Sequence, residues 1–160
     1  MPSNSWVILE FHHSRDYDPN SNKSIQRPNI NKCYSDFKAD KGKIYYALSG
    51  IKSVGHEAVS NIVKERQKNG SYKSLEDFIR RTNPKNINKL QLEGLVKAGA
   101  FDELYNNRRS LFDSIPKIIQ INKSLWEEKN SKQNNLFQNS ADKNDDLINI
   151  ENKKNWENNE

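Results

Sequence analysis

The sequence predicts a mainly α-helical protein, a small helical bundle with an extended lead-in on its N-terminal side and a disordered tail on its C-terminal side. Apolar residues recur at helical spacing in several stretches between residues 54 and 126. Short glycine-containing turns join these stretches, which is typical of helices that pack against one another. Asparagine fills 10 of the last 31 positions, where apolar residues become sparse, and this composition favours disorder.

The composition limits the chain to one modest hydrophobic core. It has 160 residues, of which 33% are hydrophobic and 29% are charged, with a mean hydropathy of −1.04. No apolar run approaches the roughly 20 residues that span a bilayer, so we expect no membrane partner. The single cysteine, Cys33, excludes an internal disulfide and fits a cytoplasmic location.

The positive charge is concentrated in the middle of the chain. Residues 41–110 carry 14 Lys and Arg against 7 Asp and Glu, a local charge of +7. Residues 126–160 carry 5 against 8, a local charge of −3. This distribution favours a polyanionic partner for the central module alone.

A glycine-containing turn followed by a helix forms the centre of the prediction. The stretch GIKSVG (50–55) precedes HEAVSNIVKERQKNG (56–70), and Asn69-Gly70 is a suitable helix end. One apolar stripe runs along this helix: Val54, Ala58, Val59, Ile62 and Val63. A turn of this kind presents unpaired backbone N–H groups at the helix start, and a phosphate can approach where side chains are small. The pattern indicates a helix-hairpin-helix, with Ser53 where the first glycine of the hairpin usually stands.

The lead-in, residues 25–45, is expected to be extended. Pro28 disfavours a helix before it, and Lys41-Gly42 predicts a turn. Tyr34, Phe37 and Ile44 are interpreted as core anchors for the module that follows.

A second helix, turn and helix unit follows the first. Ser74 with Asp77 predicts a capped helix start, Leu75, Phe78 and Ile79 form its stripe, and Asn83-Pro84 ends it. Leu92, Leu95 and Val96 share the face of the next helix, with Gly99 at its C-cap. The turn AGAFD (98–102) contains an aromatic ring and an acid, so we expect it to pack rather than to bind phosphate.

A long amphipathic helix is expected after residue 107, kinked or restarted at Pro116. We divide the chain into an unassigned leader (1–24), the lead-in (25–45), a tandem helix-hairpin-helix domain (46–129) and a flexible linker (130–160). Asp16 and Asp18 in the leader have no third acid nearby, and a solvated loop is the preferred interpretation. We expect no catalytic and no metal-binding residue in this chain.

Several of these motifs together resemble a known family. YYALSGIKSVGHEAVSNIVKER, SLEDFIRR, NKLQLEGLVKAGAFDEL and NRRSLF are similar in order and spacing to the alpha subunit of bacterial replicative DNA polymerase III. The resembling region is the tandem helix-hairpin-helix domain of that family, and QNNLF (133–137) falls where the family carries its sliding-clamp-binding peptide. The resemblance covers residues 27–138 well and the remainder weakly.

The resemblance implies non-specific binding to the backbone of duplex or primer-template DNA. The expected contacts are Lys52, Ser53, Val54, Gly55 and His56 in the turn, with Lys64, Arg66 and Lys68 as flanking charge. Gln133, Leu136 and Phe137 would bind the sliding clamp. Other replicase subunits are implied only through the parent protein.

The resemblance also implies what this chain lacks. Nucleotidyl transfer by that family uses Mg²⁺ and carboxylates on a palm domain that precedes the stretch represented here, so we expect no polymerase activity and no cofactor. Two alternatives remain open. The chain could be the helix-hairpin-helix module of a repair or recombination protein, or a gene fragment with no independent role.

Overall fold

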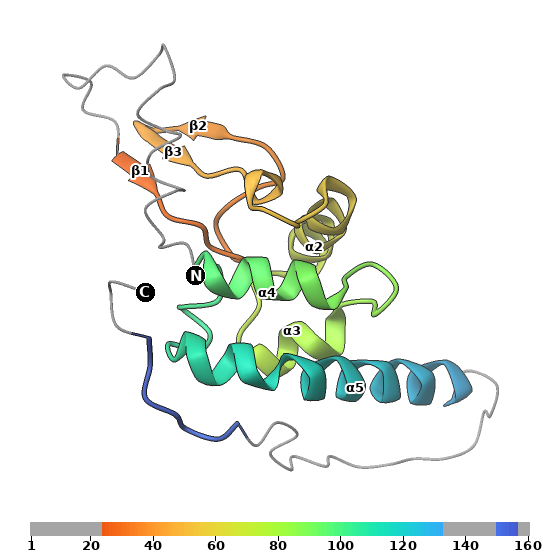
Figure 1. The fold of residues 1–160 in the computed structure, drawn as a ribbon. Helices are drawn as coiled ribbons and strands as arrows, with labels where there is room; N and C mark the ends of the chain where they lie inside the picture. The colour runs from red at the N-terminus through yellow and green to blue at the C-terminus, as the bar shows by residue number, and fades with distance from the viewer. Residues whose placement is uncertain (1–23, 133–149, 157–160) are drawn as a thin grey trace.

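The structure is a computed structural model that describes residues 24–132 and 150–156 (Figure 1). The predicted fold class is confirmed: helices dominate the described ranges, and a small three-stranded sheet lies to one side of them. The α-helices are α2 (His56–Asn69), α3 (Leu75–Arg81), α4 (Lys89–Lys97) and α5 (Arg108–Lys132). None of the described helices is long and apolar enough to cross a membrane.

The predicted extended lead-in forms most of this sheet. It contains β1 (Ser24–Gln26), β2 (Lys38–Asp40) and β3 (Lys43–Tyr45) in the order β1-β3-β2. β1 is parallel to β3, and β2 pairs antiparallel with β3. Lys41 and Gly42 have φ values of 47° and 74°, as a two-residue hairpin turn requires, so the predicted turn is confirmed.

The prediction for Phe37 as a core anchor is wrong. Its side chain is 52% exposed, because the strand that follows it, β2, is exposed along its whole length. Phe37 lies edge-on to Tyr46, with the ring centroids 5.1 Å apart. The lead-in is instead anchored by Ile30 and Cys33, which are 1% and 0% exposed.

The core lies between the helices and the loop that precedes them. Phe78 is at its centre, with its ring 5.1 Å from that of Tyr72 and 5.0 Å from that of Phe101, measured between centroids. Further large and fully buried side chains come from the 3-10 helix Leu48–Gly50, α2, α4 and α5: Leu48, Val59, Leu95, Val96, Leu111 and Ile115. The apolar stripes predicted for residues 54–63, 75–79 and 92–96 are therefore the faces that pack.

The predicted helix boundaries of the two central helices hold. α2 stops at Gly70, which has a φ of 83°. α4 ends in a Schellman motif: Ala100 N–H donates to the Leu95 carbonyl and Gly99 N–H to that of Val96, each over 3.0 Å, with Gly99 at a φ of 78°.

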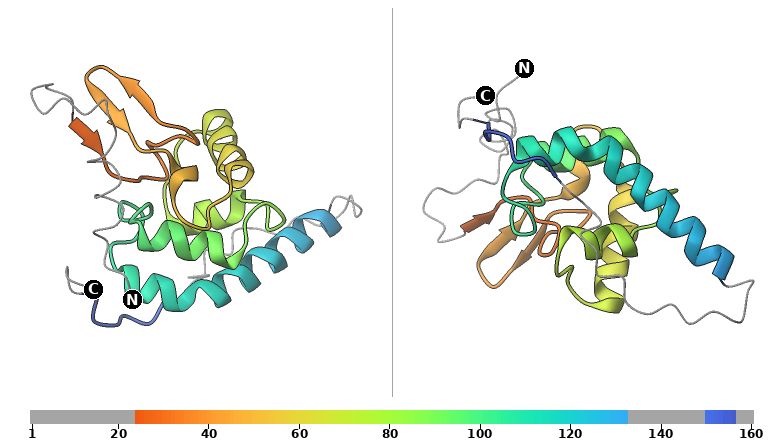
Figure 2. Two further views of the ribbon diagram at one scale, coloured as in Figure 1. Left: turned by 45° about the horizontal axis from the view of Figure 1, so that its top comes forward. Right: turned by 90° about the horizontal axis from the view of Figure 1, so that it is seen from below.

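α5 shows no restart at Pro116, one of the two outcomes predicted there, and it extends beyond residue 129, the predicted end of the domain. It continues without a restart through Pro116 to Lys132. Its second half extends beyond the other helices (Figures 1 and 2). Residues 150–156, which the sequence assigned to a flexible linker, lie against the first turns of α5. There Lys153 N–H donates to Ser110 Oγ over 2.8 Å, and the Trp156 ring lies 5.4 Å from that of Phe112.

Candidate nucleic-acid interface

The hairpin turn, residues 51–55, joins the short 3-10 helix Leu48–Gly50 to α2 and has a buried side and an exposed side. Ile51 and Val54 are 6% exposed, and Val54 N–H donates to the Ile51 carbonyl over 3.0 Å. Val54 therefore holds the turn on the core. The exposed side consists of the other predicted turn residues, Lys52, Ser53, Gly55 and His56.

The two small residues of the turn have different backbone requirements. Ser53 has a φ of 67°, in the left-handed region, which explains why glycine is usual at this place and costs a serine roughly 1 kcal/mol. Gly55 has a φ of −76°, so its backbone conformation suits any residue. A side chain at Gly55 would meet only the flexible end of Gln91, at 3.2 Å. The lack of a side chain at Gly55 keeps the start of α2 open.

Among the four α-helices of the described residues, α2 is the one whose start has no side-chain cap. Ser74 caps α3 by accepting from Asp77 N–H, and Asn88 forms a capping box with Gln91 on α4. Asn107 caps α5 by accepting from Ser110 N–H over 3.0 Å. At α2, the N-cap residue Gly55 has no side chain with which to accept such a bond. Its first-turn N–H groups, with the positive end of the helix dipole, face the exposed side of the turn.

Helix α4 packs closely against the hairpin turn at Gly94. A Cβ atom added at Gly94 would lie 2.6 Å from the Lys52 carbonyl oxygen and 3.0 Å from a Val54 methyl group. Sequence reasoning missed this residue. The available signal was a glycine within an otherwise helical pattern, which often marks a close backbone approach.

His56, the first residue of α2, has a carboxylate neighbour. Its Nε2 lies 3.1 Å from Asp36 Oδ2, and Ser60 Oγ lies 3.4 Å from its Nδ1. His56 and Asp36 are both exposed, with 60% and 80% of their side chains accessible. The pair brings one acidic group to the edge of an otherwise uncharged or cationic turn.

Arg66 does not belong with the other predicted contacts. It is 7% exposed, and its Nη1 donates to the Ile30 carbonyl over 2.6 Å. Its guanidinium also lies 5.3 Å from the centroid of the Tyr34 ring, and burial lowers its pKa. The periodicity of α2 explains the position: Arg66 lies four residues after Ile62 and three after Val63, on the buried stripe. We therefore remove Arg66 from the set of candidate DNA contacts.

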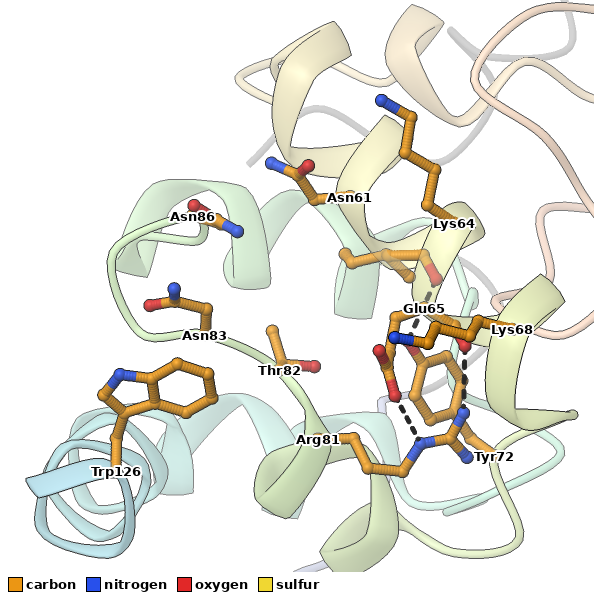
Figure 3. Close-up of a pocket in the computed structure, with 11 residues that line it drawn as sticks. Asn61, Lys64, Glu65, Lys68, Tyr72, Arg81, Thr82, Asn83, Asn86 and Trp126 are labelled. Atoms are coloured by element: carbon orange, nitrogen blue, oxygen red, sulfur yellow. Dashed lines mark hydrogen bonds and ion pairs between the residues drawn. The ribbon is translucent and has the colours of Figure 1, made fainter. Parts of the chain in front are cut away.

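Lys64 and Lys68 are exposed, but they lie away from the turn. They follow His56 by eight and twelve residues, which corresponds to about 12 and 18 Å along the helix axis. Both side chains line a cavity between α2, the segment after α3 and α5 (Figure 3). The structure thus brings residues 52–56 together and separates these two lysines from them.

Arg81 of α3 lines that cavity and binds the C-terminal part of α2 through its side chain. Its Nε lies 3.1 Å from Glu65 Oε1, and its guanidinium lies 4.4 Å from the centroid of the Tyr72 ring (Figure 3). Its Nη1 lies 3.0 Å from Asp77 Oδ2. Burial opposes the ionisation of Glu65, but the hydrogen bonds from Asn69 and Arg81 outweigh it and lower the pKa of Glu65. Burial raises the pKa of Tyr72 to about 12.

The second turn, between α4 and α5, packs as predicted. Phe101 is 2% exposed, and Arg108 Nε donates to Asp102 Oδ1 over 2.8 Å. The start of α5 is covered as well as capped, because Arg109 N–H donates to Asn155 Oδ1 over 3.4 Å. This turn therefore offers no open helix start.

The remaining predicted site residues cannot be placed. Gln133, Leu136 and Phe137, like Asp16 and Asp18, lie outside the described residues. Within the described ranges, no three His, Cys, Asp or Glu side chains gather as a metal site would require.

Comparison with known proteins agrees with this geometry. The family described as the helix-hairpin-helix motif matches residues 22–111. The chain therefore belongs to the helix-hairpin-helix family. The match includes the uncapped turn at α2, the capped turn after α4 and the strands that lead into them.

The matched part of the chain is homologous to a segment of DNA polymerase III subunit alpha. The protein of that name from Borreliella burgdorferi is 43% identical over 117 residues, which are 71% of this chain and 10% of the relative. Those from Rickettsia prowazekii and Chlamydia trachomatis are 44% identical over 102 residues and 49% identical over 75. They are covered to 9% and 6% of their length, against 64% and 47% of this chain. The chain thus spans about a tenth of the curated relatives that it matches.

Proposed function

We propose that the hairpin turn and the start of α2 bind the phosphate backbone of duplex DNA, without reading bases, as part of a replicative DNA polymerase. The observation that carries the proposal is the uncapped start of α2, since the starts of α3, α4 and α5 are all capped by side chains. A phosphate oxygen can accept the N–H bonds that a cap would otherwise accept. Homology to DNA polymerase III subunit alpha supports DNA as the ligand.

The turn itself offers one cation and a hydroxyl donor, and two exposed carboxylates, those of Asp36 and Glu57, lie at its edge. Lys52 is exposed on the turn itself, and Ser53 adds a hydroxyl donor beside it. Contacts to phosphate position a protein on DNA and carry no sequence information, so we expect similar affinity for unrelated duplex sequences.

Placing a carboxylate at the start of α2 tests the proposal. Gly55→Asp is expected to leave the free energy of unfolding unchanged or a few tenths of a kcal/mol higher, because aspartate is a good N-cap. The same change should weaken binding to primer-template DNA at least tenfold, because the carboxylate takes the N–H groups and repels phosphate. Fluorescence anisotropy of labelled DNA across a salt series measures the affinity, and thermal unfolding measures the stability.

Gln67→Glu is the matched control. It adds one negative charge to an exposed position of the same helix, about 18 Å further along its axis. We expect it to change the DNA affinity less than twofold. Equal losses in the two variants would show that net charge, and not the hairpin turn, holds the DNA.

We further propose that residues 133–137 bind a sliding clamp. The pattern of Gln133, Leu136 and Phe137 and its position directly after the end of α5 support this. The double variant Leu136→Ala, Phe137→Ala should bind an immobilised bacterial clamp at least tenfold more weakly in surface plasmon resonance, because aliphatic and aromatic anchors carry most of such an interface. The control, Asn134→Ala with Asn135→Ala, should bind as the unmodified chain does. Similar binding by both double variants would contradict the proposal.

A further inference from the structure

We infer that the cavity between α2, the segment after α3 and α5 binds an unpaired nucleotide of single-stranded DNA. The cavity has a volume of about 250 Å³, slightly below the range of about 300–1,000 Å³ for small-ligand sites. A second, more open cavity of about 510 Å³ adjoins it, and Trp126, Arg81, Lys68 and Glu65 line both. We call the two together the α2–α5 groove.

An aromatic ring and amide groups line the inner part of the groove. Trp126 reaches from α5 towards Asn83 and Thr82, and Asn61 and Asn86 lie across from it (Figure 3). A planar base can stack on an indole ring, and an amide offers a donor and an acceptor that match the edge of a base. Neither the Asn61 nor the Asn86 side chain has a hydrogen bond among the described residues, so both are available to a ligand.

Thr82 gives an independent indication of a missing polar partner. It is 6% exposed, and its Oγ1 is buried without a hydrogen bond within the described part of the chain. Buried hydroxyl groups are almost always bonded, so an unbonded one on the wall of a cavity calls for an explanation. Because Oγ1 itself has almost no accessible surface, a base in the cavity would bond to it after the Thr82 side chain turns towards the cavity.

The outer part of the groove suits a phosphate. Five cationic side chains line the two cavities: Lys64, Lys68, Lys73, Arg81 and Lys129. Only Glu65 and Asp77 oppose them, and both are paired with Arg81 at 3.1 and 3.0 Å. Lys129 Nζ lies 5.6 Å from the centroid of the Trp126 ring, so Lys64, Lys68 and Lys73 remain to attract a DNA backbone, while the ring and amides receive the base.

The groove is separate from the hairpin turn. Lys64 is about 12 Å along α2 from His56, and the groove uses α5, which does not form the turn. A chain that binds at both places would hold duplex backbone at the turn and an unpaired nucleotide in the groove. The two sites can therefore be disabled one at a time.

The test is fluorescence anisotropy of a labelled eight-nucleotide single strand against the full chain at low salt. Trp126→Ala should weaken binding about fivefold to a hundredfold, the range expected for loss of one base-aromatic stack, whereas Trp126→Phe should retain most of it. Thr82→Val should weaken binding and raise the thermal stability, because it removes an unbonded buried hydroxyl. Trp156 packs against Phe112 in the first turns of α5, and Trp156→Ala is the matched control that should not change the affinity.

Three further measurements show whether the anisotropy change arises from the groove or from the hairpin turn. Excess free 2′-deoxyadenosine 5′-monophosphate should compete with the strand, since the groove holds one nucleotide unit. Gly55→Asp should weaken duplex binding and leave single-strand binding intact, so failure of the hairpin proposal and failure of this one are distinguishable. Unchanged affinity in Trp126→Ala and Thr82→Val, or an equal loss of duplex affinity in Trp126→Ala, would overturn the inference.

Discussion

Replacing Gly94 with alanine is expected to lower the free energy of unfolding by about 2 kcal/mol. The added methyl group would lie 2.6 Å from the Lys52 carbonyl oxygen, so α4 and the hairpin turn must separate. Overpacking of this kind costs up to about 3 kcal/mol, and the better helix propensity of alanine returns about 1 kcal/mol. Urea unfolding followed by circular dichroism gives the difference.

The same variant should also bind primer-template DNA more weakly, because α4 holds Lys52 and the start of α2 in their relative positions. Gly50→Ala is the matched control. A Cβ atom at Gly50 would have no neighbour closer than 3.9 Å, so its stability and its DNA affinity should both stay close to those of the unmodified chain. If both alanine variants were equally stable, the close approach of α4 to the turn would not be a feature of the folded protein.

Replacing Arg66 with methionine is expected to lower the free energy of unfolding by about 2 kcal/mol. The substitution keeps most of the side-chain volume but removes the donor to the Ile30 carbonyl, a residue that is 1% exposed. A buried acceptor left without a partner costs roughly 1–3 kcal/mol. Arg80→Met, at an exposed position of α3, removes the same charge and should change the stability by less than about 0.5 kcal/mol.

The salt dependence of DNA binding gives a second test of the role of Arg66. Because the Arg66 guanidinium is occupied inside the protein, Arg66→Met should leave the slope of log K against log salt unchanged at temperatures where it is folded. Lys52→Met should reduce the magnitude of that slope by about 1, as expected for the loss of one phosphate contact. A smaller magnitude of this salt slope in Arg66→Met would show that Arg66 does contact DNA.

The local features of the fold could be predicted because their causes are local. The capping residue Ser74, the glycine stops at Gly70 and Gly99, and the turn at Lys41-Gly42 depend on neighbours a few positions away. The apolar stripes of α2, α3 and α4 follow the period of the helix and predict which faces are buried. The same local chemistry identified the hairpin turn as the candidate phosphate site.

Residues whose role depends on distant parts of the chain could not be assigned in this way. Arg66 and Lys68 are two positions apart on one helix, yet one is buried under Ile30 and the other lines a groove with Trp126. Phe37 has the aromatic side chain typical of a core residue, but it lies next to the exposed strand β2, outside the core. The partners of Arg66 and Lys68 lie 36 and 58 positions away, whereas Phe37 lies exposed beside Tyr46, nine positions along the chain.

The sequence by itself determined the helical class of this protein, the ends of its central helices and the turn at which α2 begins. The tertiary structure alone decided that the start of α5 is covered, because Asn155 contacts Arg109 from 46 positions along the chain. It also decided the close approach at Gly94 and the groove around Trp126. Caps and periodicity act over one or two turns of chain, whereas burial and cavities are set by which surfaces meet.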